Sequence, residues 1–226
     1  MLFKESQFLN LEQTKEREKM IELAEKTIID IDANGLNIGS GKTAAVMILE
    51  KKNDICLKIV DKNRSRSNRV NINNNVNDEL NFLDKLSSKQ FLKELNLEQE
   101  KIVPKPFLSK KELNREFLFM EHIKGSSLED ILKDKKNMSQ NINWELFFSK
   151  LENLIQELNA HNIYHRDLHA GNIMINENHE PIIIDFGDAY ESFFVDENPY
   201  REDIGTQTIT YKSDKENIQQ LKKLFL

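Results

Sequence analysis

The sequence predicts an α+β fold in which a small antiparallel sheet precedes a mainly helical part. Short apolar runs bounded by turn residues occur at 45–49, 55–60 and 116–120, which is the pattern of buried strands. From Trp144 to Leu158, apolar residues recur every three or four positions, which indicates an amphipathic helix. A second stripe of this kind lies near the N-terminus, between Met20 and Ile31.

Composition limits the kind of protein that this chain can be. Its 226 residues suit one domain or two small lobes and suffice to bury a core. The chain is 38% hydrophobic and 31% charged, as expected for a globular protein. The net charge of −6 argues against a dedicated nucleic-acid-binding protein, and no run is long enough to span a membrane. The single cysteine cannot form an internal disulfide, so we expect a reducing compartment.

The N-terminal residues favour a helix that packs on the body of the protein. Between about Leu11 and Ile31 the apolar residues share one face, and the polar face mixes both signs of charge, unlike a membrane-binding helix. The first residues lack the apolar segment of a secretory signal peptide. We therefore expect residues 1–33 to be a helical extension of a cytoplasmic protein. Delivery into a host cell by another route stays open.

The stretch YHRDLHAGNIMINENHEPIIIDFG, residues 164–187, carries the residues with the clearest chemistry. A loop carboxylate such as Asp167 can orient an attacking hydroxyl and accept its proton. The amide oxygen of Asn172 and the carboxylate of Asp185 can hold Mg²⁺ on phosphate groups. Histidine is rare, with 5 in the chain, so the His-Arg-Asp sequence carries more weight than any one of the abundant asparagines.

This stretch resembles the catalytic loop and the metal-binding Asp-Phe-Gly of the protein kinase superfamily. The resemblance implies a two-lobed kinase-like fold that uses ATP and Mg²⁺. A small antiparallel N-terminal sheet with one helix is expected at 34–123, and a truncated helical C-terminal lobe at 124–226. The C-terminal lobe is expected to be reduced because only about forty residues follow Gly187. Kinase-like features recur in family order from Leu36 to Asp214, which a polar turn between two strands does not explain.

A glycine-rich segment precedes the first predicted strand. The sequence GSGKT could form a Walker A loop, but that loop requires a glycine where this chain has Leu36, and it opens a helix rather than a strand. The segment instead resembles the glycine-rich hairpin of kinases, with alanine in place of the third glycine. The resemblance assigns nucleotide binding to Gly39, Ser40, Gly41, Ala44 and Val46.

The strand at 55–60 carries one lysine, Lys58. A buried ammonium needs a partner, because an unpaired buried charge is costly. The resemblance to the Val-Ala-Ile-Lys motif makes Lys58 the ligand of the α- and β-phosphates and gives it a glutamate from the next helix. Glu79 is the best candidate for that glutamate, with Glu94 and Glu98 as alternatives.

Four further residues are expected near the adenine. Cys56 shares one face of its strand with the lysine two residues later. It takes the small-residue place that packs on the ring, although an ordinary buried cysteine is the simpler explanation for an isolated strand. The resemblance also makes Met120 the gatekeeper and assigns adenine recognition to backbone groups near Glu121 and Ile123. Alkylation of Cys56 is then expected to block ATP binding.

The acceptor is harder to predict. Two positions after Asp167, Ser/Thr protein kinases usually carry lysine, whereas this chain has His169. Histidine there resembles aminoglycoside and choline phosphotransferases and the atypical ubiquinone-biosynthesis kinases, but these usually lack Arg166. We favour a Ser/Thr protein kinase similar to the pared-down kinases of bacterial effectors and large viruses. The alternatives are a small-molecule phosphotransferase and a non-catalytic binding protein with a kinase fold.

Regulation leaves two hypotheses. Arg166, beside Asp167, could order a phosphorylated segment. The candidate phosphorylation sites are Thr206, Thr208, Thr210 and Ser213. We favour the competing hypothesis, in which so short a segment is constitutively set or is held by an activating partner protein. The resemblance assigns catalytic roles to Asp167, Lys58, Glu79, Arg166 and His169, and metal binding to Asn172 and Asp185. A protein substrate is the expected partner, with no nucleic acid and no membrane.

Overall fold

The structure is a computed structural model, and it describes residues 3–7, 14–34, 44–49, 54–61, 76–97, 100–112, 114–134, 142–192, 198–204 and 207–226. The chain forms two compact units. The first contains residues 1–85 and 105–122, and the second contains residues 86–104 and 123–226. None of the described helices combines the length and the apolarity that crossing a membrane requires.

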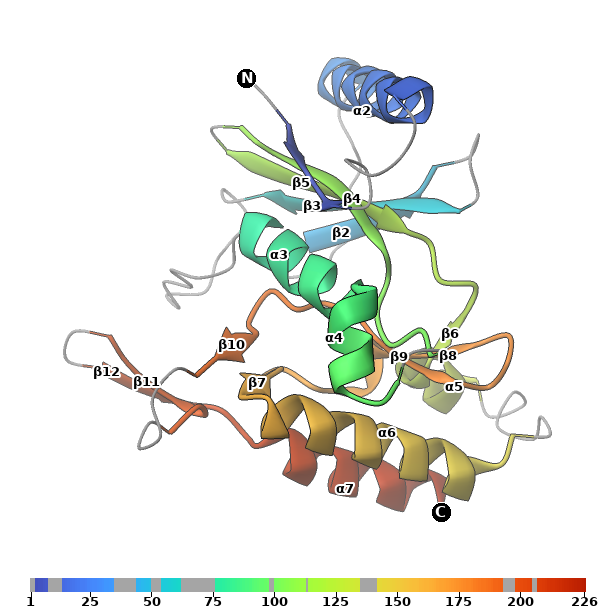
Figure 1. Cartoon of the computed structure of the whole chain (residues 1–226), viewed down its shortest axis with the longest axis vertical. Helices are drawn as coiled ribbons and strands as arrows, with labels where there is room; N and C mark the ends of the chain where they lie inside the picture. Colours follow the sequence, from blue (N-terminus) through green and yellow to red (C-terminus); the bar gives the residue numbers. More distant parts are fainter. Residues whose placement is uncertain are drawn as a thin grey trace. The chain divides into compact units, whose positions relative to one another are not determined.

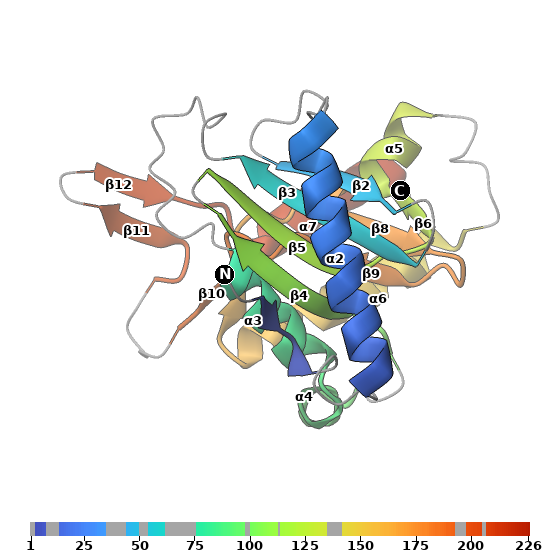
Figure 2. The same ribbon diagram turned by 90° about the horizontal axis from the view of Figure 1, so that it is seen from above.

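The first unit is an antiparallel five-stranded sheet with a helix on each face (Figure 1). Its strand order is β1-β4-β5-β3-β2, and every neighbouring pair is antiparallel. The strands are β1 (Lys4–Glu5), β2 (Ala44–Ile48), β3 (Ile55–Asp61), β4 (Pro106–Lys111) and β5 (Arg115–Glu121). Helix α2 (Thr14–Asn34) crosses over one face of the strands (Figure 2), and helix α3 (Val76–Ser87) begins on the other.

Side chains of the sheet alternate between these two faces, as the pleat of a strand requires. Leu57 and Ile59 of β3 and Phe117 and Phe119 of β5 pack in one buried cluster with Met20, Ala24, Ile28 and Ile31 of α2. The apolar stripe predicted near the N-terminus is therefore the face that α2 buries on the sheet. Lys58 lies between Leu57 and Ile59 in β3, so it faces the opposite side, where α3 begins.

The N-terminal residues do more than form a helical extension. Lys4 and Glu5 make a short edge strand, β1, in register with Ser109 and Leu108 of β4. Ser6 is buried, and its hydroxyl donates a hydrogen bond to the carbonyl of Pro106 at 2.8 Å. Residues 1–33 thus add both a strand and a helix to the first unit. A strand of two residues carries no sequence periodicity, so pattern reasoning could not find it.

The second unit contains two long helices that lie side by side, α6 (Trp144–Ala160) and α7 (Asp214–Phe225), as Figure 1 shows. They are antiparallel, because the ring of Trp144 at the start of α6 lies 4.5 Å from that of Phe225 at the end of α7. The apolar stripe predicted at 144–158 is the buried face of α6, made of Phe147, Phe148, Leu151, Leu154, Ile155 and Leu158.

Short elements of the second unit frame the loops that carry Asp167, Asn172 and Asp185. Strands β6, β8 and β9 form one antiparallel sheet, and β7 with β10 and β11 with β12 form two small pairs. The elements are α4 (Lys89–Glu94), β6 (Gly125–Ser127), α5 (Leu128–Lys133), β7 (Ile163–Tyr164), a 3₁₀ turn (Ala170–Asn172), β8 (Ile173–Asn176), β9 (Pro181–Ile183), β10 (Tyr190–Glu191), β11 (Arg201–Ile204) and β12 (Gln207–Thr210).

The second unit takes in a segment that precedes β4 and β5 in the chain. The chain passes into the second unit after His122, and residues 86–104 also belong to that unit. Phe91 of α4 is buried there and meets the ring of His161 edge-on at 5.7 Å. The Ile183 N–H also donates to the carbonyl of Ile102 at 2.9 Å. These contacts attach the segment to the second unit.

Candidate functional site

Lys58 and Glu79 form a buried ion pair within the first unit. The Lys58 Nζ lies 2.7 Å from Glu79 Oε2, and the two residues are 5% and 2% exposed. Lys58 comes from the middle of β3 and Glu79 from the first turn of α3. Because an isolated buried charge costs several kcal/mol, each group holds the other in place. Of the alternative partners, Glu94 is exposed at the end of α4, and Glu98 lies outside the described residues.

Cys56, Val46 and Met120 share the sheet face that carries Lys58. Val46 is directly opposite Lys58 in the register, and Cys56 is directly opposite Met120. Cys56 is buried, and burial, with a smaller effect of the Glu121 carboxylate, raises the pKa of its thiol to about 12. Val46 is 61% exposed. Cys56 and Val46 therefore share a face with Lys58, but Cys56 is buried whereas Val46 is exposed.

In the second unit, Asp167, Asn172 and His169 form one polar group after β7. The side-chain amide of Asn172 donates to the carbonyl of Asp167 at 2.9 Å and to its Oδ2 at 3.3 Å. His169 Nε2 lies 3.7 Å from the same Oδ2, while His169 Nδ1 accepts the Gly171 N–H at 3.0 Å. Since Nδ1 accepts, the neutral ring carries its proton on Nε2, toward Asp167. The Asp167 side chain is 53% exposed, so an acceptor can reach its carboxylate.

Asp185 directly follows Ile184, the residue after β9 that is hydrogen-bonded to Asn172. The N–H of Ile184 donates to the carbonyl of Asn172 at 3.0 Å. Asp185 has a φ of 63° and Arg166 a φ of 68°, both in the left-handed region that L-residues seldom adopt. The Gly187 N–H donates to Asp185 Oδ1 at 3.3 Å. Backbone strain of this kind, on the order of 1–3 kcal/mol per residue, gathers at functional sites.

Asn172 and Asp185 offer oxygen atoms of the kind that a hard cation prefers. The amide nitrogen of Asn172 is held by Asp167, which leaves the amide oxygen for another ligand. Over the described ranges, no group of three or more His, Cys, Asp or Glu side chains could hold a metal. Magnesium commonly binds through one or two protein oxygens together with phosphate and water. The donor pair therefore fits Mg²⁺ carried by a nucleotide phosphate.

Comparison with known proteins decides the family. The protein kinase domain matches residues 33–212 of the chain. The chain belongs to the protein kinase family. It is similar to mitogen-activated protein kinase kinase 3 of Arabidopsis thaliana, with 37% identity over 68 residues, or 30% of this chain. It is also similar to the dual specificity protein kinase zakA of Dictyostelium discoideum, with 24% identity over 162 residues, or 66% of this chain. The matches span only 13% and 18% of these relatives' lengths.

Asp214, the first residue of α7, fastens the loop that contains Asp167 to the start of that helix. Its buried carboxylate accepts the His165 N–H at 2.8 Å and the Arg166 N–H at 3.0 Å. Burial raises the pKa of the Asp214 carboxyl, although the neighbouring His165 and the donated hydrogen bonds act the other way. Asp214 therefore fixes the backbone just before Asp167. The sequence indicated only that Asp214 begins a helix. No local pattern predicts its contact with Arg166, because the two residues lie 48 positions apart in the chain.

Arg166 is engaged with the chain that follows the Asp-Phe-Gly sequence. Its Nε donates to the carbonyl of Pro199 at 2.6 Å. Its guanidinium carbon lies 4.1 Å from the ring centre of Tyr190 and 5.1 Å from that of Tyr211. Cation–π contacts of this kind are worth about 0.5–2 kcal/mol each, the more so when desolvated, and Arg166 is buried. The guanidinium thus binds protein groups in the place where the sequence allowed for a phosphate.

The predicted phosphorylation sites have different surroundings. Thr208 and Thr210 are exposed on β12. Ser213 is the N-cap of α7, where it forms a capping box with Glu216. Thr206 lies outside the described residues, as do Gly39, Ser40 and Gly41 of the glycine-rich segment. Ala44, which takes the place of the third glycine, is the first residue of β2 and lies opposite Val60.

The expected adenine-binding backbone runs from Met120 to Ile123. Met120 is buried on the Lys58 face of β5. The N–H of Glu121 donates to the carbonyl of Lys105 at 2.8 Å, and the Glu121 carbonyl accepts a weak bond from the Cys56 thiol at 3.5 Å. Among the described residues, none accepts a hydrogen bond from the Ile123 N–H.

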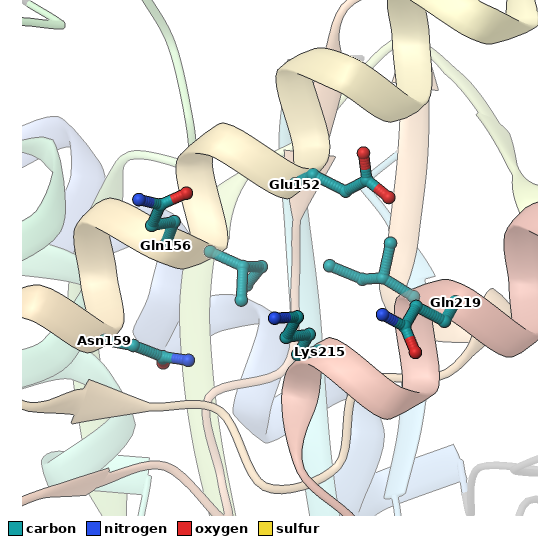
Figure 3. Close-up of a pocket in the computed structure, with 7 residues that line it drawn as sticks. Glu152, Gln156, Asn159, Lys215 and Gln219 are labelled. Carbon is teal, nitrogen blue, oxygen red and sulfur yellow. The ribbon is translucent and has the colours of Figure 1, made fainter.

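A hollow of about 530 Å³ lies along α6 and α7 (Figure 3). Its polar lining consists of Glu152, Gln156, Asn159, Lys215 and Gln219, with Ile155 and Ile218 between them. The candidate site residues described above are not part of this lining. Glu152 is paired with Lys222 at 2.9 Å, as on an ordinary helix surface. We assign no catalytic role to this hollow.

Proposed function

We propose that this chain is a protein kinase that transfers the γ-phosphate of Mg·ATP to serine or threonine hydroxyls. The observation that carries the proposal furthest is the buried pair of Lys58 and Glu79. Apolar residues could fill that space with equal or greater stability, so a buried ion pair there favours a functional role. Holding an ammonium ready for nucleotide phosphates is such a role. Membership in the protein kinase family supports phosphotransferase activity.

In the proposed reaction, Asp167 orients the acceptor hydroxyl and takes its proton as the oxygen attacks the γ-phosphorus. The new O–P bond forms while the bond to the bridging oxygen breaks, and that electron pair leaves with ADP. Lys58, kept in place by Glu79, neutralises charge on the α- and β-phosphate oxygens. Asn172 and Asp185 would hold Mg²⁺, and the ion would supply positive charge that neutralises the phosphate oxygens.

The remaining nucleotide contacts in this proposal follow the family resemblance. Cys56 and Val46 pack on the adenine, with Met120 beside them and with the backbone near Glu121 and Ile123 recognising its edge. The same resemblance assigns phosphate binding to Gly39, Ser40 and Gly41, which lie outside the described residues, and Ala44 is the first residue of β2. The buried free thiol of Cys56 suits a reducing, cytoplasmic setting.

A protein acceptor is favoured by the open surroundings of the catalytic loop. The side chains of Asp167 and His169 are 53% and 56% exposed, which suits a side chain presented by another protein. One relative is named a dual specificity protein kinase, so tyrosine belongs among the acceptors to be tested.

A small-molecule acceptor is the second candidate, and His169 is the observation that favours it. The test supplies radiolabelled ATP to the purified protein alone, to the protein with a cell lysate, and to the protein with a panel of small alcohols and aminosugars. We expect label on protein, and none with Asp167→Asn. Label confined to a small acceptor would select the second candidate. Nucleotide binding without any transfer would indicate a non-catalytic binding protein.

A further inference from the structure

The first turn of α3 is fastened to the sheet at more points than the ion pair described above. The N–H of Val76, the first residue of α3, donates to Glu116 Oε2 at 3.1 Å. The hydroxyl of Ser109 donates to Asn77 Oδ1 at 2.6 Å. Two consecutive residues of the helix are therefore bound by side chains of β5 and β4, one turn before Glu79 pairs with β3.

The side chains that contact α3, those of Ser109, Glu116 and Lys58, lie on one face of three neighbouring strands. Ser109 of β4 is opposite Leu118 of β5, and Leu118 is opposite Lys58 of β3. Residues opposite each other in an antiparallel ladder point to the same face, as do residues two apart on one strand. Glu116 therefore shares this face with Ser109 and Lys58. Both Glu116 and Ser109 are at most 1% exposed.

Glu116 has the chemistry of a helix anchor. The first N–H groups of a helix have no partner within the helix, so an external acceptor satisfies one of them. A carboxylate there is further favoured by the positive end of the helix dipole. Lys111, opposite Glu116 in the ladder, has its Nζ 4.0 Å from Glu116 Oε1 and supports the charge on the other side.

We propose that Glu116, together with Ser109, is a positioning residue that holds Glu79 against Lys58. A helix is stiff over one turn, so fixing Val76 and the residue after it also fixes the direction of Glu79. The first unit itself then holds Lys58 and Glu79 together, so an activating partner protein is not needed to form this pair. The consequence for catalysis rests on the proposed kinase function, whereas the effect on the pair does not.

The test compares Glu116→Leu, Glu116→Gln and Ser109→Ala with the unaltered protein. Glu112→Gln is the matched control, because Glu112 is an acid beside the start of β5 whose ion-pair partner is Lys110 at 2.9 Å. One readout is the rate at which an amine-acylating reagent labels Lys58, followed by mass spectrometry without nucleotide. A second is hydrogen exchange of the first turn of α3. A third is KM for ATP measured against kcat.

Glu116→Leu should speed the labelling of Lys58 about tenfold, since it leaves a buried N–H without its acceptor. It should also speed exchange in the first turn of α3 and raise KM for ATP more than it lowers kcat. Glu116→Gln keeps an acceptor oxygen and should show a smaller effect, and Glu112→Gln should show none.

Unchanged labelling and exchange in Glu116→Leu and Ser109→Ala would overturn the proposal. If Glu116→Leu does not fold, Glu116→Gln and Ser109→Ala decide by the same readouts. A protein that transfers no phosphate but shows faster labelling of Lys58 in these variants would contradict the kinase function and support the positioning role. Failure of the positioning role and failure of the proposed kinase function therefore give different results.

Discussion

Removal of one partner from the buried ion pair should destabilise the protein strongly. Glu79→Gln leaves the Lys58 ammonium, in a residue that is 5% exposed, without its carboxylate. Breaking a buried ion pair from one side costs about 3–5 kcal/mol. In a chain of this size, 1 kcal/mol shifts Tm by about 2–4 °C, so we expect a fall of about 6–20 °C.

The assay is thermal unfolding followed by circular dichroism for a double-mutant cycle. Lys58→Met removes the ammonium that pairs with the Glu79 carboxylate and should lower the free energy of unfolding by a similar amount. The double variant buries two uncharged side chains and should be more stable than either single variant, because neither buried charge is then left without its partner. Lys222→Gln, which breaks the more exposed pair with Glu152, is the control and should cost less than about 1 kcal/mol. Additive losses in the cycle would refute the coupling between Lys58 and Glu79.

Three further predictions concern other groups. Burial raises the pKa of Cys56 from 9.0 to about 12. Its alkylation near pH 8 should therefore be about 10³-fold slower than that of an exposed thiol and should accelerate with pH; rapid labelling at neutral pH would contradict this. Burial also raises the pKa of Asp84 from 3.8 to about 6. The stability that its proton contributes is complete below about pH 4 and is lost as the pH rises through about 6. Asp84→Asn should thus gain on the order of 1 kcal/mol near pH 8 after solvent screening, and urea unfolding that shows the same pH slope in both proteins would exclude this. Because Arg166 is already bound to the Pro199 carbonyl, phosphatase-treated protein should stay active; a stoichiometric phosphate within 206–213 that activity requires, found by mass spectrometry, would reverse this expectation.

Features carried by contiguous residues could be predicted from the sequence. The α+β class followed from strand and helix periodicity, and the kinase family from the His-Arg-Asp and Asp-Phe-Gly sequences, which the family match confirms. A buried lysine needs a partner, and the family resemblance favoured Glu79 while leaving Glu94 and Glu98 open; the structure pairs Lys58 with Glu79. The fold class and the family could be predicted because contiguous residues carry the pattern, whereas the pairing of Lys58 spans 21 residues and needed the family resemblance.

Features that depend on distant contacts could not be predicted. Asp214 bonds the backbone of the catalytic loop across 48 residues, and nothing beside it in the sequence indicates that. Segment 86–104 belongs to the second unit because Phe91 finds its partner at His161. Glu116 appeared only as the start of an apolar strand, although its carboxylate binds the first N–H of α3. In each case the two partners are far apart in the sequence and come together only in the folded chain.

The most direct test of the kinase proposal is transfer of the γ-phosphate by wild type, Asp167→Asn and Asp185→Asn under identical conditions. Asp167 is half exposed, so its replacement should leave Tm unchanged while transfer falls about 10²–10⁴-fold. Asp185→Asn should also lose transfer, and it should in addition weaken Mg·ATP binding measured by calorimetry. Wild-type turnover in either folded variant would contradict the assignment of these two carboxylates and, with it, the proposed mechanism.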